Sequence, residues 1–314
     1  NRCADLYSFV CALPTIKDPT GEVRRDSEGE VEVLRLYENL MRANKKLSRK
    51  QVDELLVTQI YSSERVVLIR ELFEDVRESL LEFIEAQPFH ALSIEEKALL
   101  KNQITKVKLE LPPPAKVYED ERELFTKNDV YFERRKDGQM RIRIGGAVFY
   151  TVRSRFNLAF TLAHELAHSI DPCELKHQNI DILSYHGLSE CFGASMAEYA
   201  GECKPEGVLS EIFSDWMATH VVTKLLVKSA PDFTKPQLRN AIYNSVRDLC
   251  RVDDGQEDQS AKDGLSASHP NEAYRVNRIF AQHPQIRKYL GCKDSEGPAL
   301  PGVPLYCFWS VQKK

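Results

Sequence analysis

The sequence lacks several features that would point to a particular class of protein. No apolar run approaches the roughly 20 residues that a membrane-spanning helix needs. Charge of neither sign dominates, because 43 basic residues face 47 acidic ones and the net charge is -4. The absence of a basic stripe argues against nucleic acid as a partner and gives no reason to expect an anionic membrane surface. No signal peptide is visible at Asn1, so we expect that a targeting segment has been removed.

Cysteine is absent from residues 12–172, and no pair of cysteines has the C-x-x-C spacing of a zinc ribbon or a redox helix. The eight cysteines are Cys3, Cys11, Cys173, Cys191, Cys203, Cys250, Cys292 and Cys307. Four disulfides formed in an oxidising compartment explain this distribution better than eight free thiols, although spacing alone leaves the pairing open. No N-x-S/T sequon occurs, which favours a secreted or bacterial periplasmic protein over a glycosylated animal ectodomain.

Helical patterns cover most of the first third of the chain. Residues 63–86 carry an apolar stripe at helical spacing, and Ser93 to Glu96 has the form of a capping box that opens another helix. Pro112-Pro113-Pro114 ends this block and is the clearest internal boundary. We therefore expect a helical N-terminal region at residues 1–114 and a second domain at residues 115–314.

A β-hairpin is predicted immediately after this boundary. Val130 to Phe132 and Met140 to Ile144 flank the turn pair Asp137-Gly138, and the second strand alternates apolar and basic residues. Its free edge could pair with an extended peptide, although it could also be a purely structural ribbon. With the helical blocks, the hairpin predicts a mainly helical α+β fold.

The motif that organises the chain is H-E-L-A-H at residues 164–168, inside a helix-period apolar pattern. His164 and His168 lie four residues apart, so their imidazoles project from the same side of a helix. This is the spacing of two zinc ligands, and Glu165 lies where it can reach a metal-bound water. Taken alone, the short pattern arises by chance about as readily as it marks zinc.

A second amphipathic helix begins near Ser210 and places Glu211 and Asp215 four residues apart on one face. Glu211 can complete a His-His-Glu ligand set that leaves one position open, which is typical of a catalytic zinc. Asp215 can accept the remaining ring N–H of a ligand histidine. Without the upstream motif, the acidic pair would be read as ordinary stabilisation of a helix start.

Together these segments resemble the neprilysin and endothelin-converting-enzyme family of zinc endopeptidases. Residues 164–171 are similar to the family's H-E-x-T-H-G-F-D, and Glu211 to Asp215 is similar to its E-N-x-x-D. His269 and Arg275 have its histidine-to-arginine spacing, although a lone His-Pro is usually a loop feature and Arg275 could be an ordinary surface arginine. The resemblance implies a thermolysin-like catalytic domain with a small sheet and a much reduced N-terminal helical lobe.

The same resemblance implies roles for single residues. Glu165 would be the general base, His269 would stabilise the oxyanion, and Asp215 would orient a ligand histidine. Arg275 would hold a substrate carbonyl, and Asn128 or Asp129 is the candidate for anchoring the substrate strand. The family's cysteine positions imply disulfides Cys3–Cys292, Cys11–Cys250 and Cys191–Cys307, which leaves Cys173–Cys203 as a pair peculiar to this chain.

We therefore predict a secreted or periplasmic zinc metalloendopeptidase that binds one Zn2+ per chain through His164, His168 and Glu211. Its expected partner is a peptide or protein substrate, with no nucleic acid and no membrane span; the sequence does not indicate the oligomeric state. Two alternatives remain open. One is a catalytically silent homologue that acts as a binding or regulatory module, and the other is a zinc amidase that acts on a cell-wall crosslink.

Overall fold

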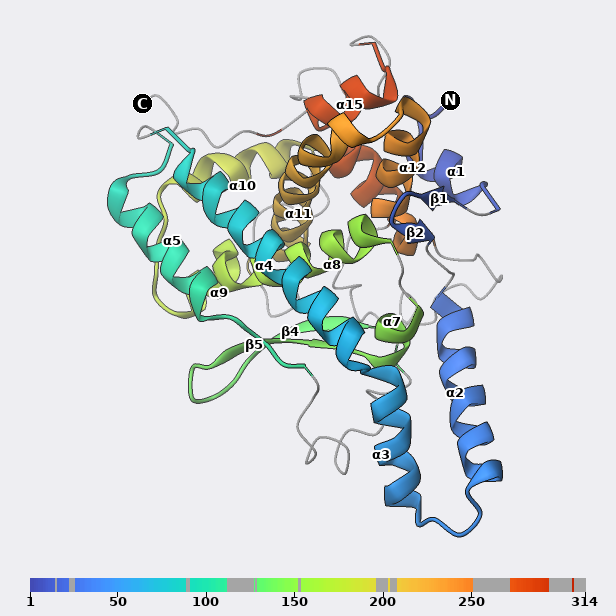
Figure 1. Cartoon of the computed structure of the whole chain (residues 1–314). Coiled ribbons are helices and arrows are strands. Elements are labelled where there is room, and N and C mark those ends of the chain that lie inside the picture. Colours follow the sequence, from blue (N-terminus) through green and yellow to red (C-terminus); the bar gives the residue numbers. More distant parts are fainter. Residues whose placement is uncertain are drawn as a thin grey trace, which may run out of the picture.

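The computed structural model describes residues 1–14, 16–22, 26–88, 91–111, 127, 129–151, 154–195, 203, 208–250, 272–293 and 307. Among these residues the chain is mainly helical and carries a small three-stranded sheet, as predicted (Figure 1). The expected boundary at residues 112–114 lies outside the described residues. Buried apolar residues on both sides of it, from Leu6 to Cys307, belong to one hydrophobic cluster.

The elements follow one another in a fixed order along the chain. The N-terminal part contains α1 (Leu6–Cys11), β1 (Lys17–Asp18), β2 (Gly21–Glu22), α2 (Asp26–Ala43), α3 (Arg49–Ile60), α4 (Ser63–Glu85) and α5 (Ile94–Lys106). The middle part contains β3 (Lys108–Leu109), β4 (Val130–Arg134), β5 (Met140–Ile144), α7 (Gly146–Thr151), α8 (Arg155–Ala167), η2 (His168–Ile170), α9 (Pro172–His177) and α10 (Ser184–Ser195). The C-terminal part contains α11 (Val208–Ser229), η3 (Ala230–Asp232), α12 (Lys235–Ser245), η4 (Arg247–Leu249), α14 (Glu272–Tyr274), η5 (Arg275–Phe280) and α15 (Pro284–Leu290).

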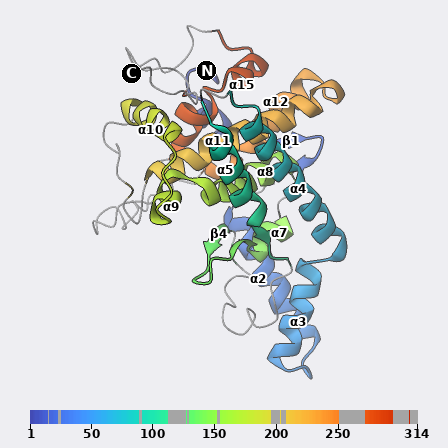
Figure 2. The same ribbon diagram turned by 90° about the vertical axis from the view of Figure 1, so that its left-hand side faces the viewer.

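The N-terminal helices begin where local signals predicted them. Helix α4 starts after the N-cap Ser62 and buries the predicted stripe, including Val66, Phe73 and Leu80. Helix α5 has the expected capping box, in which Ser93 Oγ accepts from Glu96 N and Glu96 Oε2 accepts from Ser93 N. Helices α2 and α3 form an arm that extends away from the body in both views (Figures 1 and 2).

The predicted hairpin is the core of the sheet, whose strand order is β3-β5-β4. Strands β4 and β5 are antiparallel with Phe132 opposite Ile142, and Gly138 takes the positive φ of 82° that the connecting turn needs. Strand β3 adds a parallel pair that the sequence pattern did not predict. Within the described part of the chain, β4 is therefore an edge strand, and it packs beside α8.

Helix α8 lies at the centre of the molecule because nearly all of its faces are apolar. Its residues Phe156, Ala159, Leu162 and Leu166 are among those almost fully buried. It packs against α11, α4 and α12, so both predicted metal-binding helices lie side by side in the core (Figure 1). The α-helix ends at Ala167 and continues as the 3-10 turn η2, after which Pro172 opens α9 with Asp171 as its N-cap.

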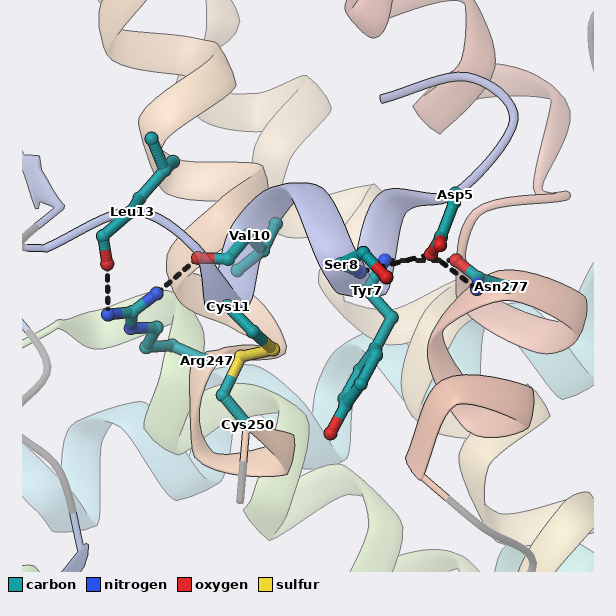
Figure 3. The surroundings of a disulfide bond; sticks show 9 residues. All are labelled: Asp5, Tyr7, Ser8, Val10, Cys11, Leu13, Arg247, Cys250 and Asn277. Atoms are coloured by element: carbon teal, nitrogen blue, oxygen red, sulfur yellow. Dashed lines mark hydrogen bonds between the residues drawn. A yellow bond between two sulfur atoms is a disulfide. The ribbon is translucent and has the colours of Figure 1, made fainter. Parts of the chain in front are cut away.

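The N-terminal helix α1 is fastened to the C-terminal part of the chain (Figure 3). Asn277 of η5 accepts a hydrogen bond from Tyr7 N at 2.9 Å and donates one to Asp5 at 2.9 Å. On the other side of α1, the Arg247 guanidinium donates to the carbonyl oxygens of Val10 and Leu13. These contacts hold the N-terminal helix against η5, the helix that begins with the predicted site residue Arg275.

Four disulfides link Cys3–Cys292, Cys11–Cys250, Cys173–Cys203 and Cys191–Cys307. Cys3–Cys292, Cys11–Cys250 and Cys191–Cys307 are the pairs that the family resemblance implies, and Cys173–Cys203 is the remaining pair expected to be peculiar to this chain. The first two join α1 and its neighbours to the segments around η4 and α15, so they reinforce the contacts in Figure 3. Four disulfides are consistent with an oxidising compartment. Among the described helices, none is both long and apolar enough to cross a membrane.

Candidate metal centre

Three potential metal ligands converge where α8 meets α11. His164 Nε2 lies 3.2 Å from His168 Nε2 and 3.0 Å from Glu211 Oε2, and His168 Nε2 lies 3.6 Å from Glu211 Oε1. The donor atoms of the three residues all lie within 4.8 Å of one another. His164 is buried, while His168 and Glu211 are partly exposed, so the group can be reached from one side.

These distances fit a tetrahedral zinc ion. Ligand atoms about 2.0–2.2 Å from zinc in tetrahedral geometry lie about 3.3–3.5 Å from one another, which is close to the three separations observed here. Two imidazoles and one carboxylate also form the ligand type that catalytic zinc sites use. The residues present therefore fit a zinc ion on both geometry and donor chemistry.

His164 is held in the required orientation by Asp215. The Nδ1–H of His164 donates to Asp215 Oδ1 at 2.9 Å, so Nε2 is the ring nitrogen left to face the other two ligands. Asp215 is fully buried and is itself bound by Arg275, whose Nε and Nη2 donate to its two oxygens at 2.7 and 2.8 Å. The carboxylate thus receives bonds from one imidazole and one guanidinium.

His168 has a different set of partners, which the sequence analysis did not find. Its Nδ1 lies 3.2 Å from Ser210 Oγ, 3.2 Å from Ser214 Oγ and 3.4 Å from Asp171 Oδ2. Ser214 follows Glu211 by three residues, so helical spacing places both on the same face of α11. That spacing was the one signal in the sequence that could have identified it.

The charges around the site favour a cation between the histidines. Burial alone would lower the pKa of His164, but its bonds to Asp215 and Glu211 outweigh burial and raise the pKa to about 10. Burial would raise the pKa of Asp215, but the charge of Arg275 outweighs it and holds the pKa at about 2. An environment that stabilises an extra proton on His164 in this way also stabilises a metal cation at the same place.

Glu165 projects from α8 towards the edge of the sheet. Its Oε2 accepts a hydrogen bond from the backbone N–H of Phe132 in β4 at 2.7 Å. Burial raises the pKa of Glu165, an effect that the neighbouring His164 and His168 oppose. The candidate general base, the ligand group and the strand edge therefore lie together.

Of the remaining predicted site residues, the structure describes Arg275, whereas His269 and Asn128 lie outside the described residues. Arg275 is not an ordinary surface arginine, because only 12% of its side chain is exposed and it is bound to Asp215. A cavity of about 170 Å3 opens beside His164, Glu165 and Arg275. Its wall includes Asn157 and Asp248, which the sequence analysis did not single out.

Comparison with known proteins supports the fold but not a family. No family model matches the sequence, and no curated protein matches it. Among solved structures, the chain is similar to the zinc metalloprotease Zmp1 of Mycobacterium tuberculosis in complex with an inhibitor, with a TM-score of 0.56 and 11% sequence identity. The similarity covers 86% of this chain and 50% of that one, so this chain spans about half the length of that protein. The chain thus has a zinc-metalloprotease fold and, within it, a candidate His-His-Glu metal site.

Proposed function

We propose that the chain is a zinc-dependent peptidase of the neprilysin-like type, acting in an extracellular or periplasmic compartment. The observation that carries the proposal is the convergence of His164 Nε2, His168 Nε2 and Glu211 at tetrahedral spacing, with Glu165 beside them. The similarity to a zinc metalloprotease and the four disulfides support it. One zinc ion per chain is the expected cofactor.

Each residue around the site has a distinct task in this proposal. His164, His168 and Glu211 hold the metal, and Asp215, Ser210 and Ser214 orient the two imidazoles. When bound, zinc supplies Lewis-acid chemistry, which polarises a carbonyl group and makes water more acidic. A carboxylate ligand and two neutral imidazoles leave a net positive site, which suits this task.

Glu165 is the proposed general base. It takes a proton from the attacking water and delivers that proton to the leaving amine of the cleaved peptide bond. Its pKa is raised by burial, so it lies closer to neutrality than that of a solvated glutamate, which suits a group that both accepts and releases a proton. Its bond to Phe132 N connects it to the strand edge.

Strand β4 is the proposed platform for the substrate. Its outer edge can pair with an extended peptide through main-chain hydrogen bonds and so bring a peptide bond past Glu165. His269, which the family resemblance assigns to the oxyanion, and Asn128, which it assigns to the substrate strand, remain proposals. The assignment of Arg275 to a substrate carbonyl is also a proposal. In addition, its two hydrogen bonds to Asp215 give Arg275 the task of positioning that carboxylate against His164.

The test is cleavage of an unfolded protein and a peptide mixture by the purified chain, read by mass spectrometry. We expect new termini that are lost after treatment with a chelator and restored by adding zinc. A chain that carries zinc at the site but cleaves nothing in either mixture would contradict the proposal. Cleavage that persists unchanged in chelator would contradict the role of the metal.

A further inference from the structure

The two histidines of the candidate metal centre are held by different kinds of partner. His164 donates its Nδ1–H to Asp215 at 2.9 Å, and Asp215 is fully buried and held in place by Arg275. A hydrogen bond of this length to an ionised acceptor belongs to the stronger class of hydrogen bonds. The His164 ring is therefore fixed by a rigid partner.

His168 shares its Nδ1–H among three oxygen atoms. Ser210 Oγ and Ser214 Oγ each lie 3.2 Å from Nδ1, and Asp171 Oδ2 lies 3.4 Å from it. When Nε2 faces a metal ion, Nδ1 carries a single hydrogen, so the three acceptors divide one donor. All three distances lie at or beyond the long end of the usual N–H···O range of about 2.7–3.2 Å. The ring of His168 is therefore held less firmly than that of His164.

The exposure of the two rings shows the same asymmetry. The side chain of His168 is 15% exposed, whereas that of His164 is 5% exposed. The backbone at His168 is well packed, because Ser169 and Ile170, which follow it in η2, are fully buried. Movement of this ligand therefore requires a turn of its ring rather than a shift of the helix end.

Helix α11 supplies both hydroxyl groups together with the third ligand. Ser210 and Ser214 are four residues apart and Glu211 lies between them, so all three belong to one face of the helix. Ser214 is fully buried, and within the described part of the chain its hydroxyl has no hydrogen-bond partner other than His168. The hydroxyl of Ser214 thus acts at the metal site and not elsewhere in the fold.

Asp171 cannot replace the two serines as a partner of His168. Its Oδ1 accepts from the backbone N–H groups of Cys173 and Glu174, each at 2.8 Å, as the N-cap of α9. The carboxylate is therefore fixed by α9, with only Oδ2 turned towards the imidazole. Without the serines, the ring can shorten this contact only by moving, which takes Nε2 out of line with the other two ligands.

Resting on the proposed function, which places zinc at this site, we infer that His168 is the ligand through which the metal is gained and lost. Ser210 and Ser214 are the positioning residues that set how long the metal stays. Release needs the His168 ring to turn away from the site. The two hydroxyl groups oppose that turn, because it breaks both of their hydrogen bonds to Nδ1.

The first experiment measures zinc release from the loaded chain after rapid mixing with an excess of chelator. The combined variant Ser210→Ala/Ser214→Ala should release zinc about 10- to 100-fold faster than the wild type, the usual effect of removing partners that orient a metal ligand. Ser229→Ala makes the same change at the other end of α11 and should release zinc at the wild-type rate. Release at the wild-type rate from the combined variant would overturn the inference.

A pair of variants at Ser210 tests the hydroxyl group itself. This residue is only partly buried, so it admits a slightly larger side chain. Ser210→Thr keeps the hydroxyl, whereas Ser210→Val has nearly the same shape and lacks it. We expect zinc to leave Ser210→Val faster than Ser210→Thr, and equal release rates would contradict the role of the hydroxyl.

Cobalt at the same site gives a readout that a merely structural role would not move. The visible absorption of bound Co2+ reports the arrangement of its ligands, and Co2+ accepts imidazole and carboxylate donors as zinc does. The position and intensity of these bands should differ between the wild type and Ser210→Ala/Ser214→Ala, while the far-ultraviolet circular dichroism stays the same. Identical cobalt spectra would contradict the positioning role.

Variants of the two supports then assign the effect to His168. In His168→Ala, removing both hydroxyl groups should leave the zinc affinity unchanged, because the ring on which they act is gone. In Asp215→Asn, which alters the support of His164, the same removal should weaken zinc binding as much as it does in the wild type. Equal losses in both backgrounds would show that the serines do not act through His168.

Peptide cleavage by the same preparations separates this inference from the proposed function. Cleavage by a chain whose zinc release is indifferent to the serines would overturn the inference and leave the peptidase proposal intact. Serine-dependent zinc release from a chain that cleaves no peptide would contradict the peptidase proposal and support the inference. A chain that binds neither zinc nor cobalt would overturn both.

Discussion

Arg275 donates two hydrogen bonds to the buried carboxylate of Asp215 beside the candidate metal site, from Nε at 2.7 Å and from Nη2 at 2.8 Å. The same carboxylate accepts the ring N–H of His164 at 2.9 Å. Asp215 therefore links a permanent positive charge to His164, a candidate metal ligand, and the position of Arg275 depends on η5, which is held against α1. Through these contacts the site is sensitive to residues that never touch a metal ion.

Replacing Asp215 with asparagine should weaken zinc binding about 10- to 100-fold, because His164 loses the charged acceptor that orients its ring. Competition with a chelator of known affinity measures this change. Asp232→Asn, which removes a charge at an exposed position, serves as the control. Zinc affinity unchanged in Asp215→Asn would show that the aspartate does not position the ligand.

Replacing Glu165 with glutamine should leave zinc content at the wild-type level and lower peptide turnover by about 10²- to 10⁴-fold, because the amide cannot accept a proton. The variant keeps the shape of the side chain and an oxygen that can accept from Phe132 N. Metal analysis and cleavage rates are measured on the same preparation. Turnover at the wild-type rate would remove Glu165 from the mechanism.

Removing the Arg275 side chain should destabilise the fold by about 3–5 kcal/mol, since the buried Asp215 would lose the cation that compensates its charge. Urea denaturation of Arg275→Met measures the loss. Arg275→Met combined with Asp215→Asn should recover part of it, because the unpaired carboxylate is then gone. If the double variant is no more stable than Arg275→Met, the cost of leaving the Asp215 charge buried and unpaired is not the cause of the lost stability.

Stability should fall in mild acid because of two buried histidines that do not belong to the candidate metal site. His220 lies between the rings of Phe83 and Trp216, with centroid distances of 4.1 and 4.6 Å, and the ring of His283 is 5.0 Å away. Burial lowers the pKa of His220 well below its ordinary value and lowers that of His283 to about 4. Both are therefore neutral in the folded chain at pH values where the unfolded chain is protonated.

The direction of this pH dependence follows from proton uptake by the unfolded chain. Above about pH 6.5 both states hold neutral imidazoles, and these groups add no pH dependence. As the pH falls from 6.5 towards 4, the unfolded chain takes up protons that the folded chain excludes, so the free energy of unfolding decreases. Each histidine contributes up to about 1.4 kcal/mol per pH unit. Urea denaturation of the chelator-treated chain at several pH values measures the free energy of unfolding. Between pH 6.5 and 4 this free energy should fall less steeply with pH in His220→Phe than in the wild type. An equal dependence on pH in both proteins would contradict this account.

Much of the fold could be predicted because its signals are local. The stripe of α4, the capping box of α5 and the Asp137-Gly138 turn each depend on residues within one element. The metal-site spacing on α8 is also local, and so is that on α11, although α11 begins at Val208 rather than near Ser210.

The parts that could not be predicted depend on contacts between distant segments. Arg141 and Arg143 alternate with apolar residues in β5 and so resemble a solvated face, yet they are 9% and 3% exposed. Glu110, from a segment 31 residues upstream of Arg141, pairs with both of them. Asn157 belongs to no sequence pattern, so its position in the cavity wall is visible only in the folded chain. Sequence periodicity separates apolar faces from polar ones, but it does not show which distant segment covers a polar face.

Anomalous diffraction at the zinc absorption edge, from crystals of the purified chain, tests the central claim most directly. The account predicts one strong peak per chain, within about 2.2 Å of His164 Nε2, His168 Nε2 and a carboxylate oxygen of Glu211. A peak at another group of residues, or its absence from crystals grown with zinc, would contradict the metal centre and the peptidase proposal built on it.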